Sequence, residues 1–292
     1  MSGRHSRAVL NRVAALNGPA RAQTWHGSSV FTQVMVLTRR AVLEYLSDPR
    51  AVLLGLLQPV IILFLVTGMF SRFATHVPGY PTDVSYFDFV LPAVLVENAV
   101  QTSLQTGSGL IDELKNGIVP RLRSLPILPS SLLTARSITG LIRTALQALI
   151  LLTLAQLTHG NFSRGGLAGL TVSLGLTLLI GWGLGWVFLA ASAWIRKAEL
   201  MQNVGFMVLL PLMFSSSAYI PIADLPTGLA IVARINPLTY AINATRIIFL
   251  QSPGGPGGTR AILPAILPAI LISLVIGAGG VFAAVTVFRR PL

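Results

Sequence analysis

The sequence lacks cysteine and contains little charge, and both absences limit what the chain can be. Without cysteine there is no disulfide, no thiolate zinc site and no cysteine nucleophile. The histidines are also scattered singly, so no metal site is predicted; they are His5, His26, His76 and His159. Charged residues make up 10% of the chain and apolar residues 53%, whereas soluble domains are roughly 25% charged. This composition predicts a membrane protein.

Lysine is almost as scarce as cysteine. The chain has two lysines, Lys115 after Leu114 and Lys197 after Arg196. A phosphate-binding P-loop needs a Gly-Lys pair, so this chain is not expected to be an ATPase of that class. If ATP drives its function, the nucleotide site must lie on a separate polypeptide. The net charge of +12 comes from basic residues beside apolar segments, a distribution typical of membrane topology signals rather than nucleic-acid binding.

Long apolar segments predict an all-α membrane protein with six transmembrane helices. A helix needs about 20 mainly apolar residues to cross the hydrocarbon core. The clearest such segment is 51–70, which carries no charge. The six expected spans cover about 51–70, 89–111, 132–157, 167–195, 200–220 and 261–288.

The distribution of Lys and Arg predicts the orientation. With the N-terminus inside, 16 of the 21 basic residues fall on or near the inner segments, as the positive-inside rule requires. Both termini are therefore expected in the cytoplasm. Residues 1–28 contain basic residues but no apolar run of signal-peptide type, which favours a disordered cytoplasmic tail, with an organellar transit segment as the alternative.

Residues 29–47 predict an amphipathic helix before the first span. At about 100° per residue, one face is mainly apolar, and Gln33, Arg40 and Glu44 lie opposite. Such a helix suits the bilayer interface, with Arg39 and Arg40 near lipid phosphates. The alternative is a helix packed on a neighbour. The expected apolar face consists of Phe31, Val34, Met35, Thr38, Ala41, Val42 and Tyr45.

A charged, proline-rich segment separates the second and third spans on the expected inner side. Its sequence is DELKNGIVPRLRSLPILPSS, residues 112–131. Prolines at these intervals prevent one long helix and favour short turns with fixed bends. A partner protein could bind a short, rigid, charged segment of this kind. The alternative is that Arg121 and Arg123 are topology anchors, which is the more common role of such residues when they are taken alone.

Two segments resemble the ABC-2 type exporter permeases, most closely their daunorubicin-resistance branch. The first is DELKNGIVPRLRSLPILPSSLLTAR, which follows the polar FVLPAVLVENAV of the second span. The second is SSSAYIPIADLPTGLAIVARINPLTYAINATR at 215–246, which is similar to the extracellular re-entrant segment of that family. The resemblance covers roughly residues 30–290 and implies one transmembrane domain at 29–290 in a bacterial plasma membrane.

The resemblance also implies a partner and a coupling site. In this family a cytoplasmic coupling helix after span two touches a separate ATPase subunit, present in two copies, which binds ATP and Mg²⁺. The permease itself pairs with a second copy or a homologue and is not an enzyme. The amphipathic helix, with Arg39, Arg40 and Glu44, lies near the same ATPase. The residues implied at or beside the coupling contact are Glu113, Lys115, Gly117, Arg121, Arg123 and Pro126.

Polar residues inside the second span form a further candidate site. Glu97, Asn98 and Gln101 lie in an otherwise apolar stretch. A carboxylate at mid-bilayer costs about 2.5–3.5 kcal/mol on insertion scales, so it normally faces a bundle interior or a wet cavity. One interpretation places these residues on a translocation route. The other is hydrogen bonding between helices without substrate contact.

The outer segment 221–246 is predicted to be re-entrant. Irregular backbone at membrane depth survives only where protein buries it or water reaches it. The apolar stretch LAIVARINPL argues against an exposed loop. Short helices that dip from the outer face between spans five and six fit better. The polar and proline residues singled out in this segment are Asp224, Arg234, Asn236 and Pro237.

Small and aromatic residues at 181–186 predict close helix packing. Gly181 and Gly185 form a G-x-x-x-G pair, which allows helices to approach closely. Trp182 and Trp186 share a helical face, and packing on lipid or a neighbouring helix is preferred to an aromatic substrate platform.

Taken with the resemblance, these features predict the membrane subunit of an ATP-driven exporter. An amphipathic drug, lipid or metabolite is the expected cargo, and a lipid-linked glycan is the alternative. A different class, an ion-coupled secondary transporter with Glu97 as the proton carrier, stays open. A non-transporting membrane scaffold is the third alternative.

Overall fold

The computed structural model describes residues 29–74, 85–115, 129–159, 166–195, 197–250 and 258–289, and within these ranges all regular secondary structure is helical. The predicted all-α class is therefore confirmed. The expected tail at 1–28 lies outside the described residues. Nine α-helices and one 3₁₀ turn occur in the described part of the chain. They are α2 (Val30–Ser47), α3 (Pro49–Ala74), α4 (Tyr86–Lys115), α6 (Pro129–His159), α7 (Gly166–Ser192), α8 (Ala198–Phe214), η1 (Ile222–Asp224), α9 (Thr227–Ile235), α10 (Pro237–Leu250) and α11 (Gly258–Arg289).

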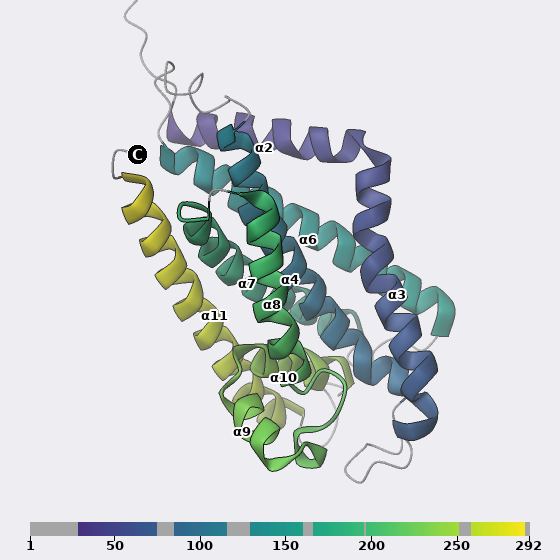
Figure 1. Ribbon diagram of the computed structural model, residues 1–292. Helices are drawn as coiled ribbons and strands as arrows, with labels where there is room; N and C mark the ends of the chain where they lie inside the picture. The colour runs from purple at the N-terminus through teal and green to yellow at the C-terminus, as the bar shows by residue number, and fades with distance from the viewer. Residues whose placement is uncertain are drawn as a thin grey trace, which may run out of the picture.

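The long helices form a bundle that α2 crosses at one end (Figure 1). The short helices α9 and α10 lie at the opposite end, and the C-terminal end of α11 returns to the side of α2. Four helices are long and apolar enough to cross a membrane, in α3, α6, α7 and α11. The protein is thus a multi-pass membrane protein. Of the other two predicted spans, α4 is long but more polar, and α8 is a shorter apolar helix.

Helix α4 lies at the centre of the bundle and is buried along most of its length. Its hydroxyl side chains donate to backbone carbonyls one turn earlier, such as Thr106 Oγ1 to Thr102 O at 2.8 Å. Ser103 Oγ also reaches Gly181 O on α7, at 2.8 Å. Because these bonds satisfy the hydroxyls locally, a polar helix can occupy an otherwise apolar core.

Helix α2 packs along α6, so it has a protein-facing side as well as an exposed one. Gln33 is buried and its Oε1 accepts a hydrogen bond from Ser131 Oγ at 3.0 Å. The prediction that Gln33 lies on the outward polar face was therefore wrong. Phe31 and Met35, predicted on the apolar face that suits the bilayer interface, are exposed on the chain. The side of α2 that packs on α6 therefore includes Gln33, whose amide oxygen is satisfied by the Ser131 hydroxyl.

Helices α7 and α11 pack closely through glycine, although not through the predicted pair. A Cβ on Gly183 would lie 2.7 Å from Ser273 O, whereas one on Gly185 would meet nothing within 4 Å. Gly181 instead faces Ala99 on α4. Trp182 lies against Gly277 of α11, as the packing interpretation of this residue predicts.

Helix α8 ends earlier than predicted. The expected span reached residue 220, but the helix stops at Phe214, and residues 215–220 form turns and bends. Pro211 removes one backbone donor from the last turn, and three serines at 215–217 compete for backbone hydrogen bonds. We call residues 215–219 the α8 linker; it leads from α8 toward η1.

Candidate functional site

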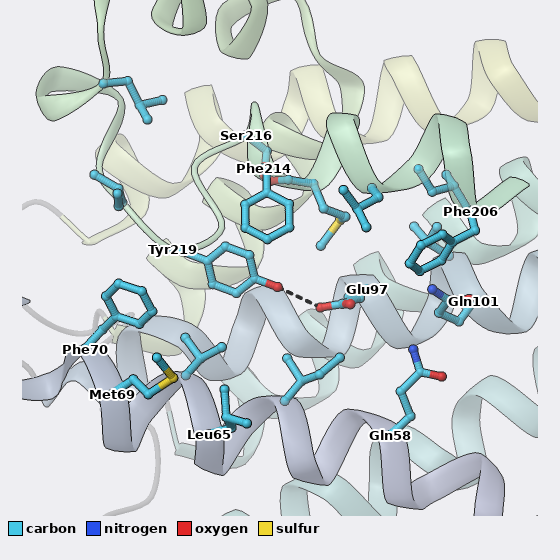
Figure 2. A pocket seen from close by; sticks show the side chains of 18 residues that line it. Gln58, Leu65, Met69, Phe70, Glu97, Gln101, Phe206, Phe214, Ser216 and Tyr219 are labelled. Carbon is cyan, nitrogen blue, oxygen red and sulfur yellow. Dashed lines mark hydrogen bonds between the residues drawn. The ribbon is translucent and has the colours of Figure 1, made fainter.

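A cavity of about 550 Å³ lies between α3, α4, α8 and the α8 linker. This volume falls in the range of about 300–1,000 Å³ that is usual for small-molecule sites. Most of the lining is aliphatic or aromatic, and Figure 2 shows the side chains that face it. Phe206 and Phe214 are 55% and 64% exposed, so the cavity is open to the surface of the single chain. The aromatic lining residues are Phe70, Phe206, Phe214 and Tyr219.

In the described part of the chain, Glu97 is the one acidic residue that lines this cavity. Its Oε2 accepts a hydrogen bond from the Tyr219 hydroxyl at 3.0 Å (Figure 2). The Tyr219 backbone carbonyl in turn accepts from the Tyr86 hydroxyl at 3.1 Å. Among the described residues that line the cavity there is no lysine or arginine. The cavity therefore combines apolar walls with a single carboxylate, an arrangement that complements a lipophilic cation.

Amide side chains supply most of the remaining polarity. Gln58 of α3 and Gln101 of α4 line the same side of the cavity, near Phe206 (Figure 2). Of the three residues predicted on a route, Glu97 and Gln101 line the cavity and Asn98 does not. Asn98 is buried, and its Nδ2 has no hydrogen-bond partner among the described residues. It lies one residue beyond Glu97 on a different side of α4, about 100° around the helix.

A second polar cluster, at the α2 end of the bundle, was missed from the sequence. Arg143 of α6 lies beside Tyr45 of α2, and its Nη1 is 3.4 Å from Gln105 Oε1 on α4. Gln147 Nε2 donates to the Tyr45 hydroxyl at 3.3 Å. The sequence placed Arg143 near the inner side by its charge alone, so its partners on α2 and α4 were not foreseeable.

The predicted coupling residues divide between described and undescribed parts of the chain. Glu113 pairs with Arg136 of α6 at two points, 2.6 Å from Nη2 to Oε1 and 2.8 Å from Nε to Oε2. Arg136 Nη2 also donates to Gly109 O at 3.1 Å. Lys115 is exposed at the end of α4. The other predicted coupling residues lie outside the described residues; they are Gly117, Arg121, Arg123 and Pro126.

The structure brings the predicted interfacial helix and the coupling region together. Arg40 and Glu44 of α2 line a small hollow that also includes Glu113 and Arg136. Arg39 is exposed. Charged groups from α2, α4 and α6 thus meet at the end of the bundle crossed by α2, which is where a partner could contact three helices at once.

In the outer segment Asn236 and Pro237 mark a helix start. The Asn236 Oδ1 accepts from Leu238 N at 3.0 Å, and Nδ2 donates to Leu212 O at 2.6 Å. Proline is favoured at a first helical position because it lacks the N–H that would go unused there. Arg234 is exposed, and Asp224 Oδ2 is buried without a hydrogen-bond partner among the described residues. These four predicted residues do not converge on the cavity.

The sequence was compared with models of known protein families. Residues 32–250 match the family model described as ABC-2 type transporter. That range covers every residue that lines the cavity.

Named relatives align over about three quarters of the chain. A putative transport permease ycf38 of Porphyra purpurea is 26% identical over 220 residues, 75% of each chain. The daunorubicin resistance ABC transporter permease protein DrrB1 of Streptomyces coeruleorubidus is 26% identical over 216 residues, 74% of each chain. A probable doxorubicin resistance ABC transporter permease protein DrrC of Mycobacterium tuberculosis is 21% identical over 224 residues, 76% of this chain and 78% of its own.

Proposed function

Because this chain belongs to the ABC-2 type transporter family, we propose that it is the membrane subunit of an ATP-driven exporter. It carries an amphipathic drug, lipid or metabolite out of the cytoplasm, and a separate ATPase subunit supplies the energy. The observation that carries this proposal is the cavity between α3, α4 and α8, with Glu97 in apolar walls.

The cavity is the proposed translocation route. Glu97 and Gln101 face it from the central helix, and exposed aromatic residues open it toward the surface of the chain. In the proposed arrangement, six helices cross the membrane, namely α3, α4, α6, α7, α8 and α11, and both termini lie in the cytoplasm. The apolar residues exposed on α3 and α8 around the cavity then face a second permease copy or a homologue, which completes the route.

The end of the bundle crossed by α2 is the proposed coupling side. The hollow lined by Arg40, Glu44 and the Glu113–Arg136 pair includes Glu113, a residue at the start of the charged, proline-rich segment 112–131. Two ATPase subunits would bind ATP and Mg²⁺ and contact this side. Movement of the ATPase pair would then reach α3, α4 and α8, the three helices that line the cavity.

The proposed cargo is amphipathic because the cavity is mainly apolar. Two of the aligned relatives are named for daunorubicin or doxorubicin resistance, which supports a drug-like compound. A lipid-linked glycan is less well matched, since an extended sugar chain requires a polar path and few polar groups line this cavity.

Reconstitution with an ATPase partner tests this function. The chain is co-expressed with a P-loop ATPase subunit, purified, and placed in vesicles with ATP on the ATPase side. Transport of an amphipathic cation that depends on ATP hydrolysis supports the proposal. Repeated isolation of an active transporter without any nucleotide-binding partner would overturn it.

A second candidate is an ion-coupled transporter in which Glu97 exchanges a proton. The observation in its favour is the Tyr219 hydroxyl on the Glu97 carboxylate inside an apolar cavity. Transport driven by a pH gradient in vesicles without ATP would support this candidate, and transport that stops when ATP is removed would exclude it.

A further inference from the structure

Arg246 is buried at the outer end of the bundle, where it binds the backbone of the α8 linker. Its Nη2 donates to Ser217 O at 2.7 Å and to Ala218 O at 3.0 Å. Its Nε donates to Phe89 O on α4 at 3.0 Å, and its guanidinium carbon lies 3.7 Å from the centre of the Phe89 ring. One side chain of α10 therefore joins the linker to the central helix.

The neighbouring carbonyls of the linker are also satisfied by side chains. Asn236 Nδ2 is 3.3 Å from Ser215 O, and the Tyr86 hydroxyl is 3.1 Å from Tyr219 O. A non-helical segment between membrane helices needs such partners because lipid offers none. Arg246 supplies two of these contacts from one planar group, which a lysine cannot do with the same geometry.

Tyr219 directly follows Ser217 and Ala218, the two residues whose carbonyls accept from Arg246. Its hydroxyl donates to Glu97, and its ring centre lies 5.7 Å from that of Phe214. Arg246 does not line the cavity. We infer that Arg246 is a positioning residue, which fixes the α8 linker so that Tyr219 occupies the Glu97 carboxylate and thereby sets how strongly the cavity prefers a cation.

This inference rests on the proposed function, since it takes the cavity to be the ligand site. When Arg246 holds the linker, one lone-pair direction of the Glu97 carboxylate is used by Tyr219. When the linker is released, the carboxylate is open to a cationic ligand. Arg246→Lys and Tyr219→Phe should therefore change cation preference in the same direction, although the two residues lie on different elements.

The first test measures the position of the linker and needs no ligand. Because the chain has no native cysteine, Ala218→Cys provides one labelling site beside Tyr219, and Ala218 is buried, so labelling there requires the linker to move. Arg246→Lys should raise the rate of maleimide labelling at residue 218 about tenfold, the effect of losing one charge-assisted hydrogen bond. Arg234→Lys is the matched control, since Arg234 is exposed on α9, and it should leave the rate nearly unchanged. Equal rates in both variants would overturn the positioning role.

The second test measures cation preference in the full-length protein. Tetraphenylphosphonium serves as the cation and triphenylphosphine oxide as the neutral probe. The ratio of their affinities should rise severalfold in Arg246→Lys and in Tyr219→Phe, and the double variant should show no further rise, because both changes act through one hydrogen bond. A lower stability with an unchanged ratio would show that Arg246 is structural only, and additive effects would also contradict the inference.

A milder variant covers the case in which Arg246→Lys does not accumulate. Tyr86→Phe removes one hydroxyl bond to the linker and should produce smaller changes of the same sign in both tests. Unchanged labelling and an unchanged ratio in Tyr86→Phe would then overturn the inference. If the unmodified protein binds neither probe, the proposed ligand site fails, while the labelling test still decides the role of Arg246.

Discussion

The Tyr45 ring on α2 lies 4.4 Å from the Arg143 guanidinium carbon on α6, measured to the ring centre. This contact joins the helix that crosses the end of the bundle to a helix within it. A cation over an aromatic face is stabilised by about 0.5–2 kcal/mol, more when water is excluded. Tyr45→Phe keeps that contact and loses only the hydroxyl bond to Gln147.

Tyr45→Leu should therefore lower thermal stability in detergent more than Tyr45→Phe does. The expected loss is about 1–2 kcal/mol for Leu and less than 1 kcal/mol for Phe. Phe31→Leu is the control, since Phe31 is an exposed aromatic residue on the same helix. Equal losses in the two Tyr45 variants would show that the ring makes no specific contribution.

The ion pair between Glu113 and Arg136 should contribute to the stability of the protein only when both charges are present. Glu113→Gln leaves the Arg136 charge partly buried without its carboxylate, and we expect a loss of about 1–3 kcal/mol. The exchanged variant, Glu113→Arg with Arg136→Glu, should recover part of that loss. If the single variant uncouples ATP hydrolysis without any loss of stability, Glu113 contacts the ATPase more than it contacts α6.

Charge reversal at Arg121 and Arg123 should uncouple ATP hydrolysis from export. Both residues lie in the proline-rich segment outside the described residues, so this prediction rests on the sequence. The protein should still enter the membrane, because most of the inner basic residues remain. The measurement compares ATPase rate and vesicle transport for the double Glu variant. Unchanged transport would assign the two arginines to topology alone.

Glu97→Gln should affect cationic cargo more than neutral cargo. The amide keeps a hydrogen-bond acceptor for Tyr219 but removes the negative charge from an apolar cavity, where charge is poorly screened. Transport of a lipophilic cation should fall at least tenfold, the effect of about 1.4 kcal/mol, while a neutral analogue should change little. Wild-type rates for both would favour a packing role for Glu97.

If the outer segment is re-entrant, as its sequence predicts, we expect slow labelling from outside. Leu229, Ile231 and Ile235 are 43%, 56% and 77% exposed on the single chain, so their surroundings decide whether a reagent reaches them. Single cysteines at these sites should react slowly with a membrane-impermeant thiol reagent, and the rate should change with the state of the ATPase. Ala233→Cys is a buried control. Fast, uniform labelling at the three sites would show an exposed loop.

The helices were predictable because apolar length and turn residues are local features. The interfacial helix was expected at 29–47 and occurs at Val30–Ser47, and the Asp48-Pro49 pair that follows it separates it from α3. The polar second span was expected at 89–111 and extends over Tyr86–Lys115. Its hydroxyl groups bond within the helix, so polarity there did not prevent helix formation.

The cavity was only partly predictable because it depends on contacts between distant residues. Glu97 and Gln101 were found because polar groups are rare in apolar segments. Tyr219 and Gln58 were not, since an aromatic residue and a lone amide carry no comparable signal. Arg246 was counted as an outer charge, and its carbonyl partners on Ser217 and Ala218 lie 29 and 28 residues away. Sequence periodicity cannot reveal such pairs.

The corner between α2 and α3 has a mechanical consequence. Asp48 accepts hydrogen bonds from Arg50 N and Ala51 N at 3.1 and 3.2 Å, and its own N–H donates to Tyr45 O. These bonds hold the bend at the point where α3 turns away from α2 (Figure 1). Most of α3 is exposed, with Leu63 buried. Because this corner ties α2 to α3, and α3 forms one wall of the cavity, we expect a roll of α2 to be transmitted to α3 and to change the width of the cavity.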